Sequence, residues 1–215
     1  MKREQAKEIL NRLKEMHPNA GCELNYNTPF ELLVAVILSA QCTDIRVNQI
    51  TKNLFKIYNT PSDFANLTLD ELKPHIYSCG FFNNKGANII NASKMIIEKF
   101  DGVVPKTMEE LLKLPGVGRK TASVILSVAF DVPAMPVDTH VFRTSKRIGF
   151  SNGNNVDEVE RDLKKIFLKE DWNMVHHTLI FHGRYICKAR NPQCDKCKLS
   201  DLCKYHLSLN KQQKV

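Results

Sequence analysis

Apolar residues recur at helical spacing along most of the chain, and no segment shows the sustained apolar–polar alternation expected of a strand. The uninterrupted apolar run from Leu32 to Leu38 is short enough to be a buried helix. The clearest stripes have the spacing of a helix with one buried face: Ala6, Ile9, Leu10 and Leu13; Ile89, Ala92, Ile96 and Phe100; Val156, Val159, Leu163 and Ile166. The pattern predicts an all-α protein without internal repeats.

Helix starts can also be located in the sequence. Four of them place Thr or Asn three residues before Glu, which can reach back to the backbone N–H of the capping residue: Thr28 and Glu31, Thr68 and Glu71, Thr107 and Glu110, Asn155 and Glu158. Two further helices are expected to begin near Arg119 and at Thr139, the second with Asp138 as its N-cap.

Length and charge narrow the class of protein. The chain has 215 residues, 43% of them hydrophobic, enough for one sizeable core or two small ones. Its formal charge of +8 suits a polyanionic partner, although a basic cytosolic protein without such a partner would show the same excess. The N-terminus has no apolar segment typical of a signal peptide, and no apolar run is long enough to span a membrane. We therefore expect a soluble, cytoplasmic protein with no membrane partner.

Four of the seven cysteines are clustered near the C-terminus. Cys187, Cys194, Cys197 and Cys203 have the spacing C-x6-C-x2-C-x5-C, whereas a disulfide scaffold would distribute its cysteines along the chain. Structural zinc sites usually contain two C-x2–4-C pairs, and here there is only one. Four thiolates can equally hold an iron–sulfur cube, so the residues alone leave both metals open. The remaining cysteines, Cys22, Cys42 and Cys79, are interpreted as small apolar fillers.

The segment LPGVGRKTA predicts a tight turn between two helices. Gly116 and Gly118 let the backbone turn sharply and approach a neighbour closely, because neither has a Cβ. Backbone N–H groups at the start of the following helix, next to Arg119, could bind a phosphate. The segment is not a P-loop, which requires a different spacing after a strand. An ordinary helix–turn–helix corner is the structural alternative.

Lys120 adds possible chemistry to this turn. It falls in the first turn of a helix, where the macrodipole disfavours a cation, and it follows Arg119 directly. Both effects favour the free amine that a Schiff-base nucleophile requires. Asp138 is expected to cap its helix, and its carboxylate could also accept a proton or stabilise positive charge on a sugar ring. The alternative for Lys120 is a simple phosphate contact.

These residues carry a resemblance to a known family. LPGVGRKTA followed by VDTHVFR resembles the helix-hairpin-helix motif and catalytic loop of the endonuclease III family of DNA glycosylases with lyase activity. The similarity covers nearly the whole chain, including LNYNTPFELLVAVILSAQCTD and HGRYIC. It implies that Lys120 attacks C1′ of a damaged nucleotide and displaces the base, that Asp138 assists, and that β-elimination then breaks the strand. The implied substrate is double-stranded DNA with damaged bases, expected to be oxidised pyrimidines, or abasic sites, bound by a monomer.

The same resemblance assigns a cofactor and further DNA contacts. It implies a structural [4Fe–4S] cluster on the four clustered cysteines, and phosphate contacts by Lys188 and Arg190 in the loop between the first two. It places Gln41 in the emptied base stack and Phe81 as a wedge on the opposite strand. The family more often has an aliphatic residue in place of Phe81 and alanine in place of Cys42. A core position for Phe81 and simple solvation for the two cations are the alternatives.

The family also implies two helical lobes. One comprises residues 22–132 and contains the hairpin; the other combines residues 1–21 with 133–215 and holds the cluster. Asp44 is expected to cap a helix beginning at Ile45. Two other functions remain open: a glycosylase without lyase activity, in which Asp138 activates water, and a non-catalytic DNA-binding module with a zinc site. Neither would need the amine of Lys120.

Overall fold

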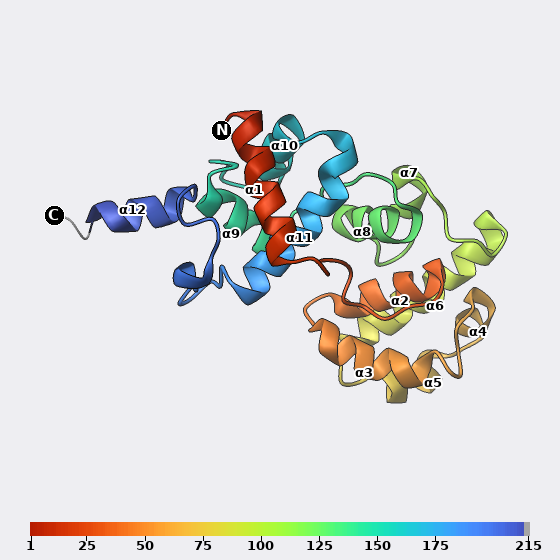
Figure 1. The fold of residues 1–215 in the computed structure, drawn as a ribbon. Coiled ribbons are helices and arrows are strands. Elements are labelled where there is room, and N and C mark those ends of the chain that lie inside the picture. Colours follow the sequence, from red (N-terminus) through yellow and green to blue (C-terminus); the bar gives the residue numbers. More distant parts are fainter. Residues whose placement is uncertain (213–215) are drawn as a thin grey trace. The chain divides into compact units, whose positions relative to one another are not determined.

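The structure, a computed structural model, describes residues 1–212 and is entirely helical over that range, which confirms the all-α prediction (Figure 1). The elements, in chain order, are α1 (Arg3–Met16), α2 (Pro29–Ser39), α3 (Asp44–Leu54), α4 (Pro61–Ala65), α5 (Leu69–Ile76), α6 (Phe82–Phe100), α7 (Met108–Leu111), α8 (Arg119–Phe130), α9 (Thr139–Ile148), α10 (Val156–Ile166), the 3-10 turn η1 (Lys169–Asp171), α11 (Trp172–Tyr185), the 3-10 turn η2 (Cys194–Lys196) and α12 (Lys204–Gln212). None of the described helices is long and apolar enough to cross a membrane.

All four motif-based helix starts lie where the sequence predicts them, but the glutamates behave differently. Only Glu71 reaches back to the backbone N–H of its own cap, Thr68. Glu31 and Glu158 instead accept from the N–H one residue before the cap, and Glu110 accepts from the Thr107 hydroxyl. The reciprocal capping box was therefore predicted wrongly in three of the four cases. A complete box that the sequence analysis missed opens α4, where the third-position carboxylate is Asp rather than Glu.

The described chain divides into two compact units. Unit 1 contains residues 1–22 and the chain from 133 onward, and unit 2 contains residues 23–132. Unit 1 is built around α1, α9, α10 and α11. Their apolar stripes form one core, which includes Ala6, Ile9, Leu10, Leu13, Val141, Ile148, Val159, Leu163, Val175 and Leu179.

Unit 2 is organised around α2, which is buried along almost its whole length. Every residue from Phe30 to Leu38 is buried, as expected of the longest apolar run in the sequence. Helices α6 and α8 pack against α2, and α4 and α5 pack against α6. A rigid central helix thus supports the turn before α8, which contains the two glycines, and the turns at either end of α2.

Candidate functional site

The hairpin between α7 and α8 has the tight turn that its glycines predict. Gly116 has φ +78°, a conformation that strains residues with a side chain. A Cβ added to Gly116 would lie 2.8 Å from Cβ of Asn88 in α6. The Val117 N–H donates to the Leu114 carbonyl at 3.1 Å and closes the turn. Gly116 is therefore required both by its backbone conformation and by the close approach of α6.

Gly118 is needed for neither reason, which corrects the expectation that both glycines serve the turn. Its φ is −89°, and a Cβ added there would meet no atom within 4 Å. Gly118 is the N-cap of α8 and has no side chain to accept a hydrogen bond from the first amides of that helix. Open space around the Gly118 Cβ position and uncapped first amides are what a phosphate site at this helix start would need.

Arg119 and Lys120 are the first two residues of α8, and both are exposed. Their helix is anchored by a buried face that includes Ala122, Ile125 and Leu126 and packs against α2. A rigid helix thus presents two cationic side chains directly beside the open amides of the hairpin. The predicted start of the helix at Arg119 is confirmed.

Gln41 and Phe81 lie in two turns that meet in unit 2. Both residues are exposed and both have the left-handed backbone conformation, with φ of 54° for Gln41 and 59° for Phe81. The turns are in contact through Cys42 and Cys79, whose sulfurs are 3.6 Å apart. These two cysteines, interpreted from the sequence as scattered fillers, are therefore neighbours in space.

The exposure of the two adjacent phenylalanines differs as a wedge would require. Phe81 is 64% exposed, so a core position for it is wrong, whereas Phe82 at the start of α6 is half-buried. Lys85, one helical turn further on, is buried and donates to the Leu38 carbonyl at 2.9 Å. This bond ties α6 to the end of α2, close to the turn that carries Gln41. Sequence analysis missed Lys85, because a lysine before Gly86 gives no sign of burial.

The expected cap at Asp44 is wrong. Thr43 is the N-cap of α3, and its hydroxyl accepts from the Arg46 N–H at 3.3 Å. Asp44 is instead the first residue of the helix, where its carboxylate lies at the positive end of the macrodipole. The threonine side chain reaches the free amide from one residue earlier, so it replaces the aspartate as the cap.

Asp138 caps α9, as predicted. One carboxylate oxygen, Oδ1, accepts from the Val141 N–H at 2.8 Å. No hydrogen bond to the second oxygen is present in the described part of the chain, and the residue is half-buried. The cap fixes the orientation of the carboxylate and leaves its second oxygen available to accept a proton.

Two arginines of α9 hold the loop that follows the first clustered cysteine. Arg143 donates to the carbonyls of Cys187 at 3.2 Å and Gly183 at 2.9 Å. Arg147 donates to the carbonyls of Lys188 at 2.6 Å and Ala189 at 3.0 Å. Sequence analysis missed both arginines, although their spacing of four residues places them on one face of the helix.

Lys188 and Arg190 are exposed in that loop. Arg147 binds the main chain of the loop itself, and Arg143 binds the main chain just before it, so the side chains of Lys188 and Arg190 are not needed to hold the loop. The Gln193 N–H donates to the Ile186 carbonyl at 2.9 Å and closes the loop at its far end. The arrangement fixes the backbone and leaves two cations directed at solvent.

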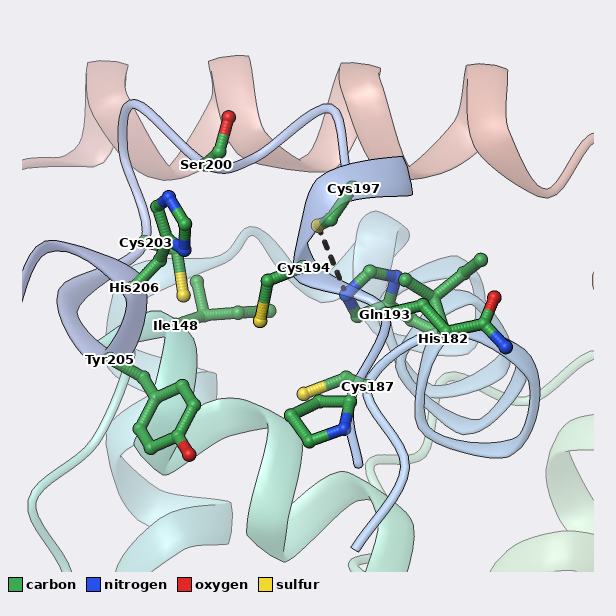
Figure 2. A pocket seen from close by; sticks show the side chains of 12 residues that line it. Ile148, His182, Cys187, Gln193, Cys194, Cys197, Ser200, Cys203, Tyr205 and His206 are labelled. Carbon is green, nitrogen blue, oxygen red and sulfur yellow. Dashed lines mark hydrogen bonds between the residues drawn. The ribbon is translucent and has the colours of Figure 1, made fainter. Parts of the chain in front are cut away.

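The four clustered cysteines surround a common space in unit 1 (Figure 2). They line one cavity, together with residues that include Ile148, His182 and Tyr205. None of the four forms a disulfide. Across residues 1–212, no three His, Cys, Asp or Glu side chains are placed to hold a single metal ion. The sulfurs therefore enclose a volume instead of meeting at one point.

This set of donors fits an iron–sulfur cube. Four thiolate ligands are what a [4Fe–4S] cluster requires, and the cavity walls are largely apolar. Burial raises the pKa of Cys197 to about 11 and also raises the pKa of Cys194 and Cys203, so binding of iron must displace protons from these thiols.

Side chains around the cavity contact the sulfurs. His182 Nε2 lies 3.7 Å from Cys197 Sγ (Figure 2). The other ring nitrogen of His182, Nδ1, lies 3.2 Å from Nε2 of His17. Arg147 lies 3.6 Å from Cys187 Sγ and stacks over the Tyr205 ring at 4.7 Å. Hydrogen bonds and a nearby cation are typical stabilisers of thiolate ligands.

The predicted site residues thus fall into two groups. Unit 2 brings together the hairpin with Gly116, Gly118, Arg119 and Lys120, and the two turns with Gln41 and Phe81. Unit 1 contains Asp138 and the loop with Lys188, Arg190 and the four cysteines, all linked through α9. Neither group contains a complete set of catalytic residues by itself.

Comparisons with known proteins identify the family. The family model of the HhH-GPD superfamily base excision DNA repair protein matches residues 34–169, and that of the iron-sulfur binding domain of endonuclease III matches residues 187–203. The chain is 54% identical over 196 residues to endonuclease III of Bacillus subtilis (strain 168), covering 91% of this chain and 90% of that protein.

Solved structures agree with these matches. A trapped endonuclease III–DNA covalent intermediate superposes with a TM-score of 0.91 at 50% identity, covering 98% of this chain and 99% of that one. A non-covalent endonuclease III–DNA complex superposes with a TM-score of 0.92 at 50% identity and the same coverage. The expected [4Fe–4S] cofactor, not zinc, is confirmed by the iron–sulfur domain and these relatives. The chain therefore belongs to the HhH-GPD superfamily of base excision DNA repair proteins and, within it, to the endonuclease III family.

Proposed function

We propose that this protein is a bifunctional DNA glycosylase and abasic-site lyase of base excision repair, with Lys120 as the nucleophile and Asp138 as its assistant. The observation that carries the proposal is the position of Lys120 in the first turn of α8, directly beside the open amides that follow Gly118. A phosphate bound at those amides would hold the target nucleotide within reach of the amine.

The first step breaks the glycosidic bond. The amine of Lys120 attacks C1′ of the damaged nucleotide, and the base leaves with the bonding electrons. The free oxygen of Asp138 accepts a proton from the attacking amine, while the other stays bound to the Val141 N–H. The carboxylate also stabilises positive charge that develops on the sugar.

The second step breaks the DNA strand. Opening of the sugar gives an imine between Lys120 and C1′, which acidifies the C2′ proton. Loss of that proton expels the 3′ phosphate by β-elimination, and hydrolysis of the imine then frees the enzyme. A glycosylase that used water in place of Lys120 would perform only the first step.

The target must leave the duplex before this chemistry can begin. Gln41 fills the emptied position in the stack, and Phe81 presses on the opposite strand, since both side chains are exposed at turns that touch. The amides of the hairpin, with Arg119, bind the phosphate on the damaged strand. Lys188 and Arg190 contribute further phosphate contacts from their fixed loop.

Cys187, Cys194, Cys197 and Cys203 are the proposed ligands of the cluster. When bound, the cluster supplies structural cross-linking of the loop, and no step of the reaction passes through it. We propose further that the protein acts as a monomer on double-stranded DNA in the cytoplasm, at oxidised pyrimidines and at abasic sites.

The test measures the two steps separately on duplex DNA containing one oxidised pyrimidine. Base release is followed by chromatography and strand breakage by denaturing gel, with the wild-type protein, Lys120→Gln and Asp138→Asn. Loss of both activities in Lys120→Gln and a strong decrease in rate with Asp138→Asn support the proposal. Base release that persists in Lys120→Gln would show that water is the nucleophile. Strand breakage that persists in Lys120→Gln would show that another amine forms the imine.

A further inference from the structure

Cys42 and Cys79 form a thiol pair outside the cluster. Their sulfurs are 3.6 Å apart, although 36 residues separate them in the sequence. Cys42 follows α2, where its N–H donates to the Ser39 carbonyl, and Cys79 follows α5, where its N–H donates to the Ile76 carbonyl. A disulfide requires an S–S distance of ~2.05 Å, so the sulfurs need to approach by only about 1.5 Å.

The two cysteines differ in their access to solvent. Cys79 is fully buried, with 0% of its surface exposed, whereas Cys42 is partly exposed. A small oxidant dissolved in water therefore reaches Cys42 first. Cys79 is the only sulfur in contact with it among the described residues, so it is positioned to react with an oxidised Cys42.

We propose that Cys42 and Cys79 are a peroxide-sensitive modification site, at which a hydroperoxide produces a disulfide that joins the two DNA-opening turns. Cys42 lies next to Gln41, and Cys79 lies two residues before Phe81. The bond therefore links the segments that enter the duplex. This regulatory consequence rests on the proposed function of those two residues; formation of the disulfide does not.

The oxidation takes place in two balanced steps. The Cys42 sulfur attacks one oxygen of hydrogen peroxide, the O–O bond breaks, and Cys42 becomes a sulfenic acid while one water leaves. The Cys79 sulfur then attacks the Cys42 sulfur, the S–S bond forms, and the S–O bond breaks. The departing hydroxide takes the proton of the Cys79 thiol and leaves as a second water. Two electrons pass from the two thiols to the peroxide, and thiol reductants reverse the change.

The surroundings favour the protonated form of Cys79. Burial raises the pKa of Cys79 to about 11, the hydrogen bond with Cys42 adds to the rise, and the positive charges of Lys85 and Arg46 oppose it. Cys79 therefore remains a thiol near neutral pH. It reacts only with a sulfur that is already activated, so the second step should become faster as the pH rises.

A disulfide should impair opening of the duplex. Drawing the sulfurs together displaces the turns that carry Gln41 and Phe81, and a displacement of ~1 Å at a working site can cost up to ~100-fold in rate. We expect base excision from fully paired DNA to fall about tenfold or more on oxidation. Cleavage of single-stranded DNA with an abasic site should change little, because nothing has to be unstacked.

Peptide mapping tests the modification site directly. The cluster-containing protein is treated with dilute hydrogen peroxide, alkylated, digested and analysed by mass spectrometry. The expected product is a peptide pair joined through Cys42 and Cys79, two hydrogens lighter than the free peptides and separated again by dithiothreitol. Cys42→Ala should abolish it and Cys22→Ala should leave it intact. Complete alkylation of both cysteines after treatment, or irreversible sulfinic acid on Cys42, would overturn the inference.

Kinetics test the consequence of the bond. Excision from paired duplex is compared for oxidised and reduced wild-type protein and for Cys42→Ala, while visible absorbance shows that the cluster survives. A loss that dithiothreitol reverses, and that Cys42→Ala does not show, supports the inference. Mapped disulfide with unchanged excision would overturn the regulatory consequence. Failure of the proposed function would be seen separately, as absence of excision in the untreated, reduced protein.

Discussion

Alanine substitution at the two glycines of the hairpin should separate the stability of the turn from its proposed capacity to bind phosphate. Gly116 and Gly118 are two residues apart and would receive the same methyl group. They differ in backbone conformation and in surroundings: φ +78° with Asn88 in close contact for Gly116, and φ −89° with open space for Gly118.

Two separate costs apply to Gly116→Ala. A left-handed conformation costs an alanine ~1–2 kcal/mol relative to glycine. The new Cβ would lie 2.8 Å from Cβ of Asn88, an atom fixed to the backbone of α6, so the helix or the turn must shift at a further cost of ~1–3 kcal/mol. The free energy of unfolding should therefore fall by about 2–5 kcal/mol, which lowers the melting temperature by about 5–15 °C in a chain of this size.

Gly118→Ala meets neither obstacle, and its effect on stability should stay within about 0.5 kcal/mol. Its methyl group would occupy open space at the N-cap of α8, next to the first residues of that helix. If a phosphate binds there, DNA affinity should fall about tenfold, since a hydrogen bond to a charged group contributes ~1.5–3 kcal/mol. The same loss should appear with undamaged DNA, because a phosphate contact does not distinguish bases.

Urea unfolding followed by circular dichroism measures the first effect, and fluorescence anisotropy with labelled duplex measures the second. A Gly116→Ala protein as stable as wild type would contradict the account of the turn. Full DNA affinity in Gly118→Ala would show that the amides of α8 do not bind a phosphate.

Three other predictions follow from the same structure. Replacing both Lys188 and Arg190 with alanine should flatten the slope of log K against log[salt] by about 1.8, at ~0.9 per phosphate contact. The control Lys113→Ala should leave the slope unchanged. An unchanged slope in the double variant would show that Lys188 and Arg190 are only solvated. Phe81→Ala should slow excision from paired duplex more than from mismatched DNA, with little loss of stability. Phe82→Ala should instead lower the melting temperature, because Phe82 is half-buried. Equal slowing of Phe81→Ala on both substrates would exclude a wedge. Freshly isolated protein should be brown and contain about four irons per chain, and stoichiometric zinc without iron would contradict the cluster.

Local signals in the sequence predict most of the fold. Apolar stripes mark the buried faces of α1, α6 and α10, except that Val156 at the start of α10 is exposed. Capping residues mark where helices begin, and both signals depend on a few neighbouring residues. The cap wrongly predicted at Asp44 also rests on such a local signal. Thr43 and Asp44 are both good caps, and only the backbone conformation decides between them.

Contacts between distant segments could not be predicted in this way. Arg143 and Arg147 bind carbonyl groups 40 to 44 residues away, and Lys85 binds a carbonyl 47 residues away. The contact between Cys42 and Cys79 likewise depends on how α2 and α5 end near one another. Such partners are backbone atoms or small side chains that leave no regular spacing in the sequence. The proposed catalytic residues and cluster ligands, by contrast, belong to compact sequence motifs.

Borohydride trapping tests the central claim, that Lys120 forms the covalent intermediate, most directly. Wild-type protein is incubated with duplex DNA containing one abasic site, reduced, digested and mapped by mass spectrometry, alongside Lys120→Gln and the exposed-lysine control Lys113→Gln. We predict one DNA adduct, located on Lys120, abolished in Lys120→Gln and retained in Lys113→Gln, with binding to abasic DNA largely preserved in all three. An undiminished adduct in Lys120→Gln, or an adduct mapped to another residue of the wild-type protein, would contradict the account.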